Sequence, residues 1–179
     1  MRLDMNLPVA LLTLFAAALL QDLIPVTPSF PVKVVFLTSV ALHAALTKPV
    51  WVALTTLAWA GGLTDALGGL PLFCTFTFLL MMYGVVRMLQ RVFLTATLVQ
   101  GTLLVACAAV AQALWTQLWA GTGAPFLEWQ TLVALGYAAP AGAVAGLAGF
   151  AVCGVADRVS GNVKPVKESN GLLWAETDR

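Results

Sequence analysis

The chain has 179 residues, of which 60% are hydrophobic and 9% are charged, with a net charge of +1 and a mean hydropathy of +0.92. Soluble domains carry about 25% charged residues, so the composition excludes a soluble globular domain. The small net charge argues against a nucleic-acid partner or an acidic substrate. A polytopic α-helical membrane protein fits, because a membrane-spanning backbone must satisfy its own hydrogen bonds.

Six apolar runs approach or exceed the roughly 20 residues that a helix needs to cross the hydrocarbon core. The predicted spans are, in chain order, Leu7–Ile24, Val32–Leu46, Pro49–Leu67, Leu72–Leu89, Val92–Trp119 and Thr131–Ala156. The first begins like a signal peptide, but it lacks a clean cleavage site and is expected to be a retained span. The second is short, the fifth is long enough to tilt, and the sixth is expected to kink at Pro140.

The predicted fold class is therefore an all-α integral membrane protein with six transmembrane helices over residues 1–156. Residues 157–179 are polar, and their four basic and four acidic side chains cancel. This composition predicts a flexible cytoplasmic tail.

The basic residues predict the orientation of the six spans. If the N-terminus is cytoplasmic, eight of the nine basic residues lie on the inner side and only Lys33 lies outside. The inner set is Arg2, Lys48, Arg87, Arg91, Arg158, Lys164, Lys167 and Arg179. The positive-inside rule then predicts that both termini are cytoplasmic.

The stretch "GGLTDALGGLPL" places one acid, Asp65, between two glycine pairs near the end of the third span. Glycine past a helix end, followed by proline, is the expected stop signal. Asp65 is unusual, since a carboxylate in the last turn meets the negative end of the helix dipole and is costly near a membrane unless paired or hydrated. The candidate helix-packing or partner-docking residues are Gly61, Gly62, Asp65, Gly68, Gly69, Pro71 and Leu72.

Three interpretations of Asp65 follow from the residues around it. The bare face formed by Gly61, Asp65 and Gly69 allows a neighbouring helix to approach closely, as small-xxx-small motifs do, and to bring donors to the carboxylate. The stretch would then be a packing seam within the chain. Asp65 could instead bind an ion or a proton, or the same face could dock a helix or loop of a partner.

The sixth span carries a secondary face of small residues, Ala138, Gly142 and Gly146. Ala145, Gly149 and Cys153 form a second row about 60° further round, because three residues advance a helix by about 300°. Two small faces predict packing in the interior of the bundle. The single histidine, His43, is expected to form an interhelical hydrogen bond, and Gln112 is expected to make bundle contacts.

No pattern in the sequence predicts an enzyme or a bound cofactor. The chain has no Ser-His-Asp set, no Cys-His pair, no His/Glu metal cluster and no phosphate-binding loop. Its three cysteines, Cys74, Cys107 and Cys153, lie in apolar runs without metal-ligand or redox spacing, and they are expected to be small buried residues.

The residues "LLQDLIP", "FPVKVVFL", "GGLTDALGGLPL" and "YGVVRMLQ" resemble the bacterial rod-shape-determining MreD family over about Leu19–Phe93. Positions Gly61, Asp65, Gly69, Pro71 and Leu72 match the motif that ends the third span in that family. One departure is Phe73, since the family usually has glycine after the Pro-Leu pair.

The resemblance implies a non-enzymatic scaffold of the cell-elongation (rod) complex in the bacterial inner membrane. It would help to maintain cell shape by coupling an MreC-like single-span protein and peptidoglycan synthases to the cytoskeleton, beside other membrane proteins of the complex. A second hypothesis is a small-molecule-binding membrane subunit of a vitamin-type transporter. Such a subunit needs a polar or aromatic cavity open to the outside, which the short, charge-poor outer loops disfavour.

Overall fold

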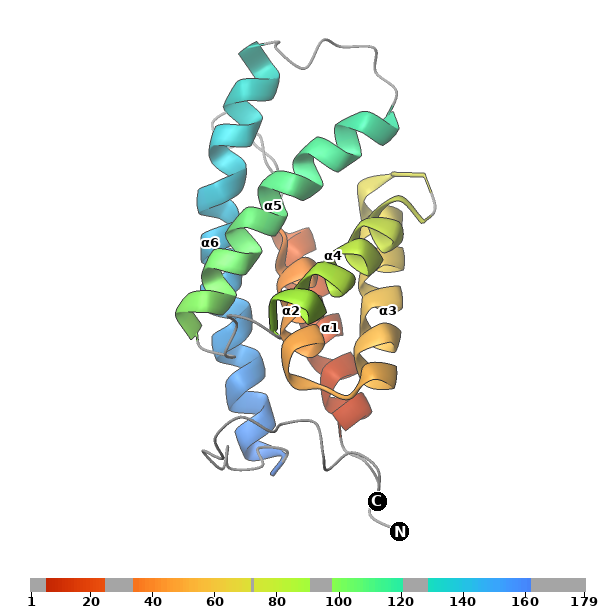
Figure 1. Cartoon of the computed structure of the whole chain (residues 1–179), viewed down its shortest axis with the longest axis vertical. Coiled ribbons are helices and arrows are strands. Elements are labelled where there is room, and N and C mark those ends of the chain that lie inside the picture. Colours follow the sequence, from red (N-terminus) through yellow and green to blue (C-terminus); the bar gives the residue numbers. More distant parts are fainter. Residues whose placement is uncertain (1–5, 25–33, 72, 91–97, 121–128, 162–179) are drawn as a thin grey trace.

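The computed structural model describes residues 6–24, 34–71, 73–90, 98–120 and 129–161, and this part of the chain is helical (Figure 1). The helices are α1 (Asn6–Leu23), α2 (Phe36–Thr47), α3 (Val50–Gly68), α4 (Cys74–Gln90), α5 (Leu98–Ala120) and α6 (Trp129–Val159). Each corresponds to one predicted apolar run. The all-helical prediction is therefore confirmed for the described residues.

Helix α2 begins at Phe36, later than predicted, and α6 ends later than predicted. The span was expected to end at Ala156, but α6 continues through Asp157 and Arg158 to Val159. The helix also runs without interruption across Pro140. The predicted tail from residue 162 onward lies outside the described residues, as do Lys33 and residues 92–97 of the predicted fifth span.

Five helices form a closed ring around α2. Neighbouring contacts run from α1 to α3, α4, α5, α6 and back to α1, and α2 contacts every member of this ring. Figure 1 shows α1 beginning and α6 ending at the same end of the bundle. This end also holds Lys48, Arg87 and Arg158. They are the described members of the set of basic residues that was predicted to be cytoplasmic. We call this end of the bundle the basic end.

Helix α2 is the core of the bundle and is buried on all sides. All ten residues from Leu37 to Leu46 are buried. Its 12 residues span only about 18 Å at 1.5 Å per residue, well short of a hydrocarbon core of about 30 Å. The second apolar run, which is short in the sequence, is therefore a helix enclosed by its neighbours.

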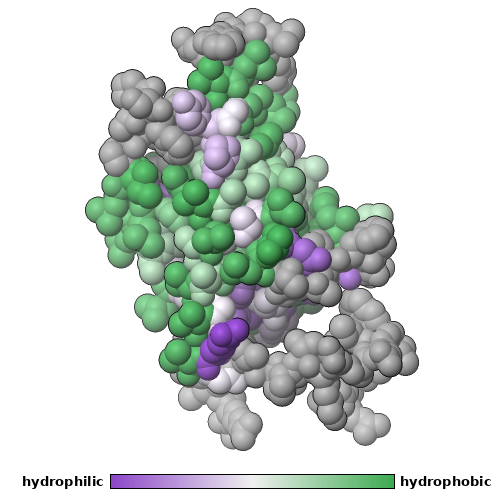
Figure 2. All heavy atoms as spheres, turned by 90° about the vertical axis from the view of Figure 1, so that its left-hand side faces the viewer, coloured by the Kyte–Doolittle hydropathy of each residue, from purple (hydrophilic) through white to green (hydrophobic). Residues whose placement is uncertain are grey.

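The outside of the ring is apolar, as expected for a protein in a bilayer. Hydrophobic side chains cover most of the described surface in the view that faces α6 (Figure 2). Helices α3, α5 and α6 are long and apolar enough to cross a membrane, and α1, α2 and α4 are shorter apolar helices. Cys107 is exposed on this surface, so its predicted burial is wrong, whereas Cys74 and Cys153 are buried as expected.

Candidate functional site: the hairpin between α3 and α4

Helix α3 ends at the glycine pair as the sequence predicts. Gly69 is the C-cap residue, with a φ of 62° in the left-handed region, and its N–H donates to the carbonyl of Asp65. The N–H of Leu70 donates to the same carbonyl at 3.0 Å. Glycine is favoured here because a Cβ atom is strained at positive φ.

Asp65 caps the following helix rather than its own. Its side chain is 1% exposed, and Oδ1 accepts the backbone N–H of Thr75, in the first turn of α4, at 2.9 Å. The N-terminus of α4 carries orphan N–H groups and the positive end of a helix dipole, so a carboxylate is stabilised there. The expected donor from a neighbouring helix is thus a backbone amide of α4.

Two buried oxygen atoms beside this bond have no hydrogen-bond partner, namely Oδ2 of Asp65 and Oγ1 of Thr75. They belong to the two residues that the capping bond already joins. A threonine hydroxyl can rotate to suit an acceptor, and it would complete the cap if it turned toward the carboxylate.

The glycines of the motif have different environments. A Cβ atom on Gly61 would lie 2.6 Å from the Cα atom of Phe76, so only glycine allows α3 and α4 this close approach. A Cβ atom on Gly62 or Gly69 would meet nothing within 4 Å. Gly61 therefore lies where α3 and α4 approach each other closely, whereas Gly69 forms the end of α3.

Gly62 lies on the outer face of α3, beside Trp59, whose side chain is 51% exposed. With Ala58 and Leu63 these residues line an open groove of about 350 Å³. Gly68 and Pro71 are exposed near the tip of the hairpin, and Leu72 lies outside the described residues.

Phe73 has an unusual backbone conformation at the start of α4. Its φ is 71°, and it is the non-glycine residue with positive φ among the described residues. Its ring is 65% exposed and contacts Phe76 edge-on, with ring centroids 6.2 Å apart. A bulky residue in this region is strained, so the turn keeps a glycine-like geometry without a glycine.

The two small faces of α6 contact different helices. A Cβ atom on Gly142 would lie 2.6 Å from that of Ala109, and one on Gly146 would lie 3.0 Å from the Cα atom of Thr102. Both partners are on α5, and Ala138 is buried in the same row. In the second row, Gly149 approaches the side chain of Ser39 on α2. One row therefore faces α5 and the other faces α2.

The polar residues that hold α2 were not recognised from the sequence as a set. At its N-terminal end, Gln21 of α1 accepts the N–H of Leu37 at 3.1 Å, and Gln112 of α5 accepts the Thr38 hydroxyl at 2.7 Å. At its C-terminal end, Gln90 of α4 donates to the carbonyl of Leu46 at 2.9 Å. Helix ends leave four backbone groups unsatisfied, and Gln21 and Gln90 bond to one such group at each end of α2.

At the same end of α2, Arg87 of α4 donates to the carbonyl of Lys48 at 3.2 Å and also contacts the ring of Tyr83. The Lys48 ammonium forms an ion pair with Asp157 of α6 at 2.5 Å, and both residues are buried. In the sequence, only their positions pointed to this pair, because both residues come just after an apolar run on the predicted inner side.

His43 lies one turn before this ion pair, on the side of α2 that faces α6. Its ring packs edge-on against Phe150 of α6, with centroids 5.0 Å apart. Its Nδ1 atom lies 3.4 Å from the hydroxyl of Thr47, on the same helix. The contact between helices is thus aromatic, where the sequence predicted a hydrogen bond.

No protein family matches the chain, and neither a curated protein nor a solved structure is significantly similar to it.

Proposed function

We propose that this protein is an MreD-like, non-enzymatic scaffold of a bacterial cell-elongation complex. It would lie in the inner membrane with six spans and both termini cytoplasmic, and it would hold an MreC-like single-span protein and other membrane proteins of the complex. In this arrangement the basic end of the bundle faces the cytoplasm.

The observation that carries the proposal is the hairpin built by the motif residues. Gly61, Asp65 and Gly69 each have a separate structural role in one turn between two helices. Phe73, which stands where the MreD family usually has glycine, adopts the positive φ that glycine favours. This backbone conformation supports the proposal, because a glycine at this position would favour it.

The outer face of α3 suggests where a partner would bind. The groove beside Gly62 is apolar and open, and the neighbouring exposed side chains Trp51 and Leu54 continue the same helix surface. A glycine in such a face allows close approach of another membrane helix. Because Gly61 already serves the packing of α4, Gly62 remains for an external contact.

A co-purification experiment tests the proposal through Gly62→Leu. The new side chain has room in the monomer, since a Cβ atom there meets nothing within 4 Å, but it fills the groove. We expect recovery of the MreC-like partner to fall at least about tenfold, which corresponds to 1.4 kcal/mol of binding free energy.

Gly84→Leu is the control, because Gly84 is another helical glycine whose Cβ atom would meet nothing within 4 Å, and it lies on α4. It should leave recovery unchanged at equal membrane levels. Unchanged recovery with Gly62→Leu would remove the groove from the proposal. Recovery of an ATPase pair or a bound vitamin with the wild-type protein would favour the transporter subunit and overturn the scaffold.

A further inference from the structure

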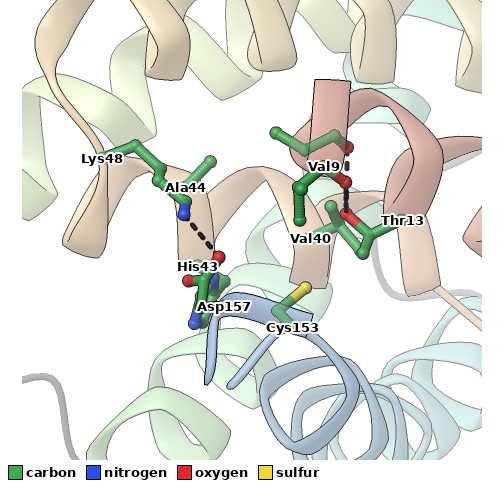
Figure 3. Close-up of a pocket in the computed structure, with 9 residues that line it drawn as sticks. Val9, Thr13, Val40, His43, Ala44, Lys48, Cys153 and Asp157 are labelled. Atoms are coloured by element: carbon green, nitrogen blue, oxygen red, sulfur yellow. Dashed lines mark hydrogen bonds and ion pairs between the residues drawn. The ribbon is translucent and has the colours of Figure 1, made fainter. Parts of the chain in front are cut away.

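A small cavity adjoins the Lys48–Asp157 ion pair at the basic end of the bundle (Figure 3). Its volume is about 10 Å³, and its lining comes from three helices. Thr13 lies on α1, His43 precedes Lys48 by about one turn on α2, and Cys153 precedes Asp157 by one turn on α6. The volume is about that of one water probe sphere, the lower limit for holding a water molecule.

The polar groups around the cavity are suited to bind water. The carboxylate of Asp157 accepts a hydrogen bond from Lys48 and can accept others, since its two oxygen atoms offer about four lone-pair sites. The Thr13 hydroxyl donates to backbone carbonyls of its own helix and keeps its acceptor capacity. Buried water molecules usually make two to four hydrogen bonds, and this lining can supply them.

The tautomer of His43 provides a further acceptor. The Thr47 hydroxyl donates its one proton to the carbonyl of His43 at 2.8 Å, so toward Nδ1 it can act only as an acceptor. The contact at Nδ1 therefore favours the tautomer that carries its proton there, which leaves Nε2 as an acceptor. His43 of α2 and Asp157 of α6 both line the cavity, and a water molecule between them has two protons to donate to these two acceptors.

We infer that this cavity binds one water molecule, which joins His43 of α2 to the Lys48–Asp157 pair. The water donates to the imidazole and to the carboxylate, so the contact between α2 and α6 is a hydrated polar cluster. This inference does not depend on the proposed scaffold function.

An isosteric pair of substitutions at Cys153 tests the inference. Valine and threonine have nearly the same shape, and both side chains occupy the cavity, but only threonine has a hydroxyl that can replace the polar contacts of water. In a hydrated cavity, Cys153→Thr should unfold in detergent at a temperature about 2–4 °C higher than Cys153→Val.

Val86 supplies the matched control, because it is fully buried on α4 in an apolar environment. Val86→Thr should unfold at a lower temperature than the wild type, since it adds a hydroxyl at a dry position. In both threonine variants the hydroxyl can bond a carbonyl of its own helix, so this bond affects both comparisons alike. Threonine that is more stable than valine at position 153, but less stable than valine at position 86, therefore reports on the cavity.

A dry cavity gives the reverse result at Cys153, with valine more stable than threonine, and this would overturn the inference. If neither Cys153 variant inserts into the membrane, a high-resolution crystal structure of the wild-type protein decides. Density for an ordered water between His43 and Asp157 supports the site, and clear density of the lining without it refutes the site.

Discussion

At the scale of single residues, Asp65 shows how one side chain can be unfavourable for one helix and favourable for the next. Its backbone belongs to the last turn of α3, where the dipole is negative, but its carboxylate caps the first turn of α4. The distance from Oδ1 to the Thr75 amide is 2.9 Å. The acid therefore joins the two helices of the hairpin.

This role predicts different results for two substitutions of Asp65. Asp65→Asn should cost less than about 1 kcal/mol of unfolding free energy, because asparagine caps helices about as well as aspartate. Asp65→Leu should cost about 1–3 kcal/mol, since it leaves the amide of Thr75 buried without an acceptor. Reversible unfolding in mixed micelles measures both values.

Thr55→Leu is a suitable control, because Thr55 bonds only its own helix in the exposed part of α3. It should change stability little. If Asp65→Asn were as damaging as Asp65→Leu, the negative charge would be essential, and capping would not explain the residue.

At the scale of helices, the fold depends on how α2 is held. Helix α2 is enclosed by five others, and side chains from α1, α4, α5 and α6 bond to its two ends. The ion pair at Lys48 is the charged member of this set. It also explains why α6 continues past Ala156, since Asp157 is neutralised by a partner inside the bundle.

A double-mutant cycle tests the ion pair. Lys48→Met alone and Asp157→Leu alone should each cost about 3–5 kcal/mol of unfolding free energy, because each leaves a buried charge without its partner. The double variant should be more stable than either single one, since two apolar side chains can replace a buried pair at little cost. Additive losses in the same unfolding assay would show that the two side chains are not energetically coupled.

At the scale of the whole molecule, the ring of helices around α2 has an apolar outer surface and one basic end. Odd-numbered helices begin, and even-numbered helices end, at the basic end, as expected for a chain that crosses a membrane repeatedly. Even α2, which does not match the membrane thickness, preserves this alternation. Helix α6 therefore ends at the end of the bundle where α1 begins (Figure 1).

Reporter fusions test this orientation. The eight-to-one distribution of basic residues predicts that a cytoplasm-dependent reporter is active at either terminus, and that a periplasm-dependent reporter is inactive at both. A reporter fused directly after Ala120 should show the opposite pattern. Activity of the periplasm-dependent reporter at the C-terminus would contradict the six-span arrangement.

The sequence by itself determined the class of the fold, the number of helices and the end of α3. Hydrophobic runs bounded by charges and prolines report directly on helices in lipid, and the Gly-Gly-x-Pro pattern reports on local backbone conformation. The close approach at Gly61 and the two small faces of α6 were also predictable, because small residues at helical spacing mark a packing face.

Only the tertiary structure decided which helix is central and which polar residues meet. The sequence showed only that the second run is short, whereas the structure encloses it on all sides. Gln21, Gln112, Arg87 and Asp157 come from four different helices, and nothing in their spacing along the chain relates them. The physical reason is that local patterns specify a helix and its faces, whereas the partner of each face depends on how all six helices share one interior.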